Sequence, residues 1–338
     1  MRKRKLIPKN KYVNVVCVVL IAVVIALGYV FGWRSVVKTD VVFNIDRGTS
    51  VSAVATELVA HDLIDSPDLF KLAVRGNGGA VQSGMYDIAR GTSLWRMARM
   101  FARGDVAATT VVIPEGLTVQ QIKQLLMETP TLTGGVECGD DTDLPVCDLH
   151  DGELFPDTYR VARGTSRLAF LDLMRKKMMD VKENWQRAGR IAPKPLRDWN
   201  DVVTLASIVQ KETPRTDEMP IVASVYLNRL RDGMRLQADP TVVYALTNGL
   251  GDMQGRPLLR GHLQIDSSYN TYKNYGLPPG PIANVGLDAI YAVLQPADTN
   301  YLYFVADGQG GHRFARTYDQ HMKNHADWRA IKKLKAQE

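Results

Sequence analysis

The sequence predicts an α+β protein with a single N-terminal membrane helix, and three observations lead to this fold class. An uncharged, apolar run covers 12–33, directly after a basic N-terminus. From about residue 41, short β-branched runs alternate with amphipathic helical patterns. A strongly apolar helix is predicted in the C-terminal half, over 202–211. The length of 338 residues leaves room for an anchor and two ordinary domains.

The N-terminal segment is predicted to be a basic tail, 1–11, followed by a transmembrane helix, 12–33. The run is close to the roughly 20 residues that a membrane-spanning helix needs. The alternative, a cleaved signal peptide, has an apolar region of only about 7–15 residues. Positive charge before the run keeps the N-terminus in the cytoplasm. We therefore expect a single-pass protein whose bulk lies outside the cytoplasm.

The composition argues against several classes of function. The net charge is +6, from 42 Lys and Arg against 36 Asp and Glu, and much of it lies in 1–11. No basic patch with interleaved aromatic residues follows, so we expect no nucleic-acid partner. The sequence has no Walker-type loop, CxxC or HExxH. His321 and His325 stand at helical spacing, but nothing nearby completes a metal site. We expect neither a metal nor an organic cofactor.

Two cysteines stand close together in the polar segment VECGDDTDLPVCD. In an oxidising compartment Cys138 and Cys147 could close a small disulfide, and the alternative is two free thiols on a loop.

A weak repeat organises the chain between about 41 and 126. Each copy has a short β-branched run, a glycine, a Ser or Thr, and then an amphipathic helix. A Ser or Thr at this place accepts hydrogen bonds from the first turn of the helix. The predicted N-caps are Ser50, Ser93 and Thr118, with Ser166 as a fourth. The repeat could equally be three ordinary strand-to-helix junctions of an α+β domain.

The C-terminal half is organised around two helices and a turn. The first helix is apolar at nearly every position, yet it contains Ser207 and Gln210. The second helix covers 220–230, and Asn228 falls near its end. The Asp239-Pro240 pair then marks a turn.

These motifs resemble the YceG-like endolytic murein transglycosylases, also called the MltG family. The resemblance covers almost the whole chain. It rests on VVIPEGLTVQQI (111–122), DGELFPDTYRV (151–161), LASIVQKETPRTDEMPIVASVYLNRLRDGMRLQADPTVVY (205–244), SSYNTYKNYGLPPGPIANVG (267–286) and YLYFVADGQGGHRFARTYDQH (301–321). It implies a LysM-like α+β module over 40–130 and a mixed α/β catalytic domain over 150–338.

The resemblance also implies an activity. Its members cut the MurNAc–GlcNAc linkage inside nascent peptidoglycan strands, leave 1,6-anhydroMurNAc ends and so terminate strand elongation. The implied partners are peptidoglycan strands, the bacterial inner membrane through one helix, and a peptidoglycan synthase. A lytic transglycosylase needs one carboxylic acid because the sugar's own 6-hydroxyl attacks its anomeric carbon.

This chain departs from the family pattern at the implied acid. The pattern in the first helix is ASI-V-E-K-E, and Gln210 stands where the first glutamate belongs. An amide has no acidic proton to give. The alternative function is therefore a catalytically inactive member that binds glycan or acts as a scaffold. Glu212 is the minor candidate for the acid, because an ideal helix places it about 200° from Gln210. It could serve only if the helix ended before Glu212, which the following Thr213-Pro214 would allow.

The remaining candidate positions are implied substrate contacts. They are Ser207, Glu218, Asn228, Gln237, Asp239, Thr241, Tyr269, Asn270, Tyr272 and His312. Glu153 and Asp157 are further candidate glycan contacts, with Phe155 and Tyr159 as platforms for sugar rings; the alternative for this segment is a well-ordered turn between the domains.

Overall fold

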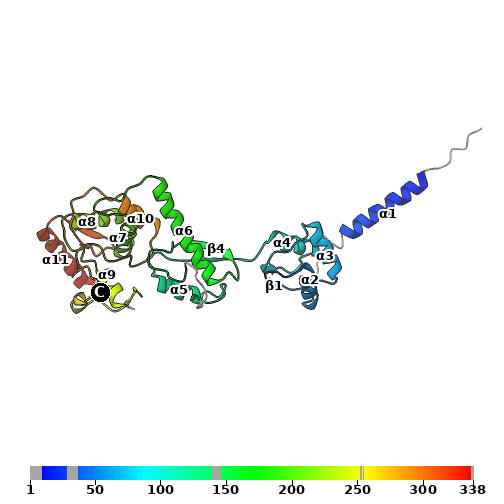
Figure 1. The fold of residues 1–338 in the computed structure, drawn as a ribbon, viewed down its shortest axis with the longest axis horizontal. Helices are drawn as coiled ribbons and strands as arrows, with labels where there is room; N and C mark the ends of the chain where they lie inside the picture. Colours follow the sequence, from blue (N-terminus) through cyan, green and yellow to red (C-terminus); the bar gives the residue numbers. More distant parts are fainter. Residues whose placement is uncertain (1–9, 29–36, 139–145, 252, 254, 336–338) are drawn as a thin grey trace, which may run out of the picture. The chain divides into compact units, whose positions relative to one another are not determined.

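The computed structural model describes residues 10–28, 37–138, 146–251, 253 and 255–335. The chain divides into two compact units (Figure 1). The first comprises Met1–Thr109 and Arg160–Gly164, and the second comprises Thr110–Tyr159 and Thr165–Glu338. Both contain helices and small sheets, so the predicted combination of α and β structure is confirmed.

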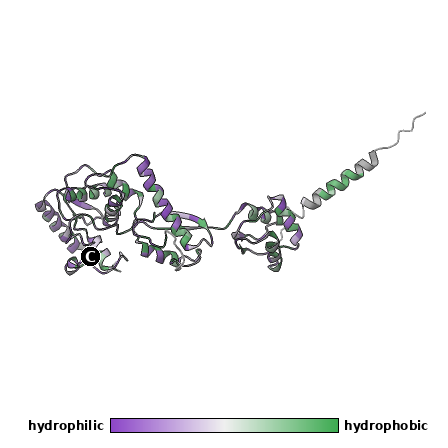
Figure 2. Cartoon of the chain, viewed as in Figure 1, coloured by the Kyte–Doolittle hydropathy of each residue, from purple (hydrophilic) through white to green (hydrophobic). Residues whose placement is uncertain are grey.

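The first helix, α1, covers Asn10–Gly28, and the apolar residues of its middle are visible in Figure 2. The predicted span of 12–33 runs on into 29–36, which lie outside the described residues. Within the described part of the chain, no helix combines the length and apolarity needed to cross a membrane.

The first unit is built on a strand–helix–helix–strand order. Its elements are β1 (Val41–Ile45), α2 (Val51–Ala60), α3 (Pro67–Gly76), β2 (Gly84–Ile88) and α4 (Leu94–Arg103). β1 and β2 pair in antiparallel fashion with Phe43 opposite Tyr86. Both rings pack with Phe101 of α4, at centroid distances of 5.9 and 4.6 Å. Phe70 of α3 packs on the same ring at 6.1 Å, so the small core has aromatic rings at its centre with aliphatic side chains around them.

All four predicted N-caps are confirmed. The side chains of Ser50, Ser93 and Ser166 each accept a hydrogen bond from the backbone N–H three residues later. Thr118 does the same and forms a complete capping box with Gln121. Each cap satisfies a donor that the start of a helix leaves free.

The second unit carries the remaining elements. They are β3 (Ala108–Val112), α5 (Val119–Glu128), β4 (Thr158–Ala162), α6 (Arg167–Arg187), α7 (Trp199–Glu212), α8 (Met219–Arg231), α9 (Asp239–Leu246), the 3₁₀ helix η2 (Arg260–Gln264), α10 (Leu287–Leu294), β5 (Tyr303–Ala306), β6 (His312–Ala315) and α11 (Tyr318–Lys335). β3 pairs with β4, and both strands cross the division between the units. β5 and β6 form an antiparallel hairpin. α5, the helix of the third repeat, belongs to this second unit.

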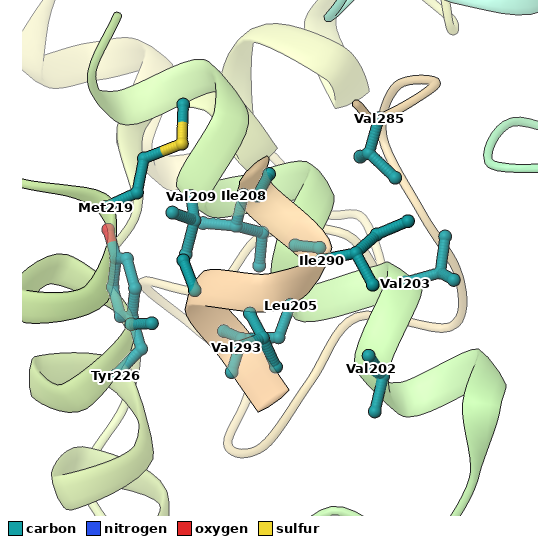
Figure 3. Packing of buried hydrophobic residues seen from close by; sticks show 14 of the residues in the cluster. Val202, Val203, Leu205, Ile208, Val209, Met219, Tyr226, Val285, Ile290 and Val293 are labelled. Atoms are coloured by element: carbon teal, nitrogen blue, oxygen red, sulfur yellow. The ribbon is translucent and has the colours of Figure 1, made fainter. Parts of the chain in front are cut away.

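The core of the second unit forms around α7, which packs on α8 and α10. Figure 3 shows Ile290 and Val293 of α10 beside Leu205, Ile208 and Val209 of α7. Every residue from Asp201 to Val209 is buried, so α7 is enclosed on all sides rather than on one face.

The predicted disulfide is confirmed. Cys138 and Cys147 are bonded, with their Cα atoms 5.6 Å apart. Of the nine residue steps that it spans, 139–145 lie outside the described residues.

Candidate active site

The C-terminal end of α7 places a glutamate beside a cavity. Glu212 is the last residue of the helix, and Thr213 is already extended, with φ −141° and ψ 133°. Thr213 precedes Pro214, and a residue before proline is driven out of the helical region. Glu212 lines a cavity of about 290 Å³ together with Asp239 at the start of α9.

The surroundings of Glu212 favour a protonated carboxyl group near neutral pH. Burial raises its pKa to about 7, and the negative charge of Asp239 acts in the same direction. The Tyr226 hydroxyl donates a hydrogen bond of 2.7 Å to Oε1 of Glu212, which opposes the rise. Tyr272 donates a hydrogen bond of 2.5 Å to Oδ1 of Asp239. These four side chains form what we call the carboxylate cluster: Glu212, Asp239, Tyr226 and Tyr272.

Gln210 points elsewhere. Its Oε1 accepts a hydrogen bond of 3.2 Å from the backbone N–H of Gly286, and its side chain is hydrogen-bonded to Glu115. Burial raises the pKa of Glu115, and the hydrogen bond from Gln210 opposes that rise. Gln210 is not among the residues that line the cavity beside Glu212. In this position it ties α7 to the loop before α10 and to the PEGLT segment.

Three of the predicted substrate contacts are fully buried and hold the backbone in place. Ser207 accepts a hydrogen bond from the Ile282 N–H at 3.0 Å. Thr241 shares a hydrogen bond of 2.8 Å with Thr271. Asn270 donates to the carbonyl oxygens of Leu263 and Ile265. These side chains shape the walls of the site from inside the protein.

Four other predicted contacts form hydrogen bonds with groups outside the carboxylate cluster. Asn228 donates to the carbonyl oxygens of Thr299 and Tyr301. Glu218 and His312 contact each other, with 2.7 Å between Oε2 and Nδ1. Gln237 is exposed, with φ +50°, and donates through its backbone to Thr271. Of the predicted contacts, only Asp239 and Tyr272 belong to the carboxylate cluster with Glu212.

Tyr269 lines a second and larger cavity, of about 800 Å³. Its ring lies 4.8 Å from that of Tyr244, which lines both cavities. The Tyr244 hydroxyl donates a 2.7 Å hydrogen bond to Asp151, and burial raises the pKa of that carboxyl group. Glu153 also lines this cavity. The platform predicted from Phe155 and Tyr159 is wrong, because both rings are buried in the core.

Sequence reasoning missed Tyr226, Tyr244, Asp151 and Glu115. Tyr226 is buried in α8, where a helical pattern predicts only a core residue. Asp151 and Glu115 lie within the two upstream motifs, DGELFPDTYRV and VVIPEGLTVQQI. These motifs carry the family resemblance, but neither residue was predicted to have a role in the site. Across the described residues, no group of three or more His, Cys, Asp or Glu side chains could hold a metal ion.

Comparisons with known proteins find relatives that cover most of the chain. The model of the YceG-like family matches residues 43–327. An endolytic murein transglycosylase of Bacillus subtilis is 32% identical over 310 residues, which is 85% of this chain and 84% of the relative. The protein of the same name in Streptococcus pneumoniae is 28% identical, over 91% of this chain and 64% of its own length.

A solved structure extends the likeness to the fold. A yceG-like protein of Listeria monocytogenes matches with a TM-score of 0.50 and 28% identity, over 85% of this chain and 99% of the solved one. The family model covers well over half of the sequence and runs through both compact units. The chain therefore belongs to the YceG-like family.

Proposed function

We propose that this chain is a lytic transglycosylase that cuts peptidoglycan strands internally and that Glu212 is its general acid. One observation carries the proposal: a carboxyl group with a pKa of about 7 lines a cavity and faces a second carboxylate. Cleavage of a glycosidic bond needs a group that stays protonated near neutral pH and can reach the departing oxygen. The names of the curated relatives supply the substrate, murein.

The reaction needs only the side chains of the carboxylate cluster. Glu212 donates its proton to the glycosidic oxygen as the bond to the muramyl C1 breaks. The negative charge of Asp239 stabilises the positive charge that develops at the sugar ring. The 6-hydroxyl of the same muramyl residue then attacks C1 and returns its proton to Glu212. One glycosidic bond breaks, one intramolecular ether forms, and no water is consumed.

The assignment moves the acid from position 210 to position 212. The alternative, a catalytically inactive member that binds glycan or acts as a scaffold, was motivated by the amide of Gln210, and that amide is hydrogen-bonded to Gly286 and Glu115. Glu212 provides an acid two residues further on. If the chain binds strands without cleaving them, product analysis by mass spectrometry will detect no new ends.

Further parts of the proposal concern location and binding. The uncharged run at 12–33 supports an anchor in the inner membrane with a cytoplasmic N-terminus. The strand–helix–helix–strand order of 41–88 supports a LysM-like module that binds amino-sugar polymers. An anchored enzyme of this kind would meet nascent strands beside a peptidoglycan synthase and end their elongation.

Product analysis tests the function. Purified peptidoglycan strands are incubated with the full chain, and the new ends are identified by mass spectrometry. We expect internal cuts with 1,6-anhydroMurNAc ends. Products heavier by one water for each cut would identify a hydrolase instead, and uncut strands that remain bound would identify the scaffold function.

The pH dependence gives a second expected result. Because Glu212 must be protonated to act, kcat/KM should fall about tenfold per pH unit above a pKa of about 7. The Tyr226 hydroxyl favours the charged form, so Tyr226→Phe should raise the pKa and move this descending limb to higher pH. Initial rates at saturating and at low substrate between pH 5 and about 9 measure the shift. A limb that stays in place, or moves to lower pH, contradicts the role given to Tyr226.

A further inference from the structure

The larger cavity is a second binding surface next to the carboxylate cluster. It measures about 800 Å³ and lies wholly within the second compact unit. Tyr244 lines both cavities, and Pro281 of the larger one is followed directly by Ile282 of the smaller one. A ligand at Glu212 therefore has this surface as an immediate neighbour. The proposed reaction uses none of the charged residues that line it.

One part of the lining is cationic and comes from α6. Arg175, Met178, Met179 and Lys182 follow each other at the spacing of one helix face, over two turns. Arg175 lies 3.6 Å from Asp172. Lys182 is exposed and has no carboxylate partner among the described residues. This face offers positive charge at its two ends and flexible thioether side chains between them.

Another part of the lining is acidic and comes from the segment that follows the disulfide. Asp148, Asp151 and Glu153 all line the cavity. Asp151 is occupied by the Val119 N–H and the Tyr244 hydroxyl. Asp148 is exposed and pairs with no cation within the described part of the chain. The Cys138–Cys147 bond fixes the chain next to Asp148, so this acidic wall is covalently braced.

Rings and prolines supply the apolar part. Trp199, Tyr244 and Tyr269 line the cavity, and so do Pro279 and Pro281. Such a surface binds aliphatic chains and the faces of rings, while the charges at its margins fix the orientation of the ligand. The complete lining therefore matches a ligand that carries an amine, a carboxylate and apolar stems.

From this lining we infer that the larger cavity binds the short peptide attached to the muramyl residue of the strand. The inference rests on the proposed function. The peptides of murein carry free carboxylates and an amine on aliphatic side chains. The carboxylates would pair with Arg175 and Lys182, and the amine with Asp148. A strand without its peptides keeps a lactyl carboxylate on each muramyl residue, but it has no amine for Asp148 and lacks the carboxylates of the peptide.

Other polymers fit the lining less well. A polyanion would meet Asp148, Asp151 and Glu153, and a polycation would meet Arg175 and Lys182, so each would face charges of its own sign. Only a ligand that carries both positive and negative charges can pair with both the acidic and the cationic part of the lining.

Binding to two matched probes tests the inference. One probe is a labelled, short MurNAc–GlcNAc oligomer that carries its peptides, and the other is the same oligomer after an amidase has removed them. With the full chain, we expect Kd to be about 3- to 10-fold lower for the peptide-bearing probe, the size of effect that two partly exposed charge contacts give. The double variant Arg175→Gln/Lys182→Gln should reduce this preference, because it removes both partners of the peptide carboxylates and leaves only Asp148 to bind the amine. Lys333→Gln, a charge loss on α11 outside the cavity, is the matched control and should keep the preference.

The outcomes separate the two proposals. Equal Kd values for the two probes, or a preference that the double variant leaves undiminished, would overturn the peptide site whether or not the chain cleaves. Anhydro products are scored independently on both probes. If cleavage fails on both while the preference is found, the proposed function falls and the binding site stands.

Discussion

Replacing Glu212 by glutamine should reduce the formation of anhydro ends by at least about 10²-fold and by up to about 10⁴-fold, because general acid catalysis supplies gains of that size. The substitution keeps the shape of the side chain and leaves an oxygen for the Tyr226 hydroxyl, which donates at 2.7 Å. Binding of strands should therefore persist. The measurement is the initial rate of anhydro product formation at a pH below 7, together with Kd for an uncleaved strand.

Gln210→Glu is the matched comparison for this variant. If position 210 held the acid, this substitution would create activity that the parent chain lacks. With Glu212 as the acid, it should change the rate by less than about threefold, since the new carboxylate faces Glu115 and the Gly286 N–H rather than the smaller cavity. A parent chain that is inactive until position 210 becomes glutamate would refute the assignment.

The Glu212→Gln variant also has a stability signature. The folded chain holds the Glu212 proton more tightly than the unfolded chain, because the pKa rises from 4.5 to about 7. This group's contribution to stability is fully present below pH 4.5 and is lost as the pH rises through 7. The glutamine variant should lack that loss, so its Tm should exceed that of the parent above pH 7.

The helix that carries the acid shows how much of the site could be predicted from the sequence. Ideal geometry placed Glu212 and Gln210 on nearly opposite faces, and the structure has them in separate environments. In the fold, α8 and α10 enclose α7, and α9 also packs against it, so both faces meet protein. Which of two enclosed faces opens onto a cavity depends on segments far away in the sequence, such as Asp239 and Tyr272.

Local features were the easier part to predict. The helix caps depend on a Ser or Thr and the three residues that follow, and the disulfide depends on two cysteines in one short loop. Thr241 and Asn270 show the opposite case. Both are polar residues in motifs that carry the family resemblance, so they were predicted to contact substrate. In the structure, each forms hydrogen bonds inside the protein with buried backbone or hydroxyl groups. Sequence alone does not separate these two uses of a polar side chain.

The second large effect is expected at Asn284, a fully buried side chain that joins three segments around the site. Its Oδ1 accepts hydrogen bonds from the N–H groups of Gly152 and Leu154, at 3.0 and 2.9 Å, and its Nδ2 donates to the Leu117 carbonyl at 3.0 Å. Asn284→Ala leaves two buried N–H groups without this acceptor. We expect the free energy of unfolding to fall by about 2–4 kcal/mol, because an unsatisfied buried group costs about 1–3 kcal/mol. Thermal and urea unfolding of the full chain measure the loss.

Two further variants show whether the loss comes from these hydrogen bonds. Asn284→Asp keeps an acceptor for Gly152 and Leu154, but its buried carboxylate would face the Leu117 carbonyl, so its loss should be smaller than that of alanine only at a pH low enough to protonate it. Asn274→Ala removes an exposed amide that also donates to two carbonyl oxygens, and it should cost less than about 1 kcal/mol since water replaces the lost partner. Equal losses for Asn284→Ala and Asn274→Ala would mean that burial of the junction contributes nothing. The expected order, with Asn284→Ala lower in stability than Asn274→Ala, would mean that the PEGLT segment, the Gly152 turn and the loop before α10 are held as one unit beside the larger cavity and the end of α7.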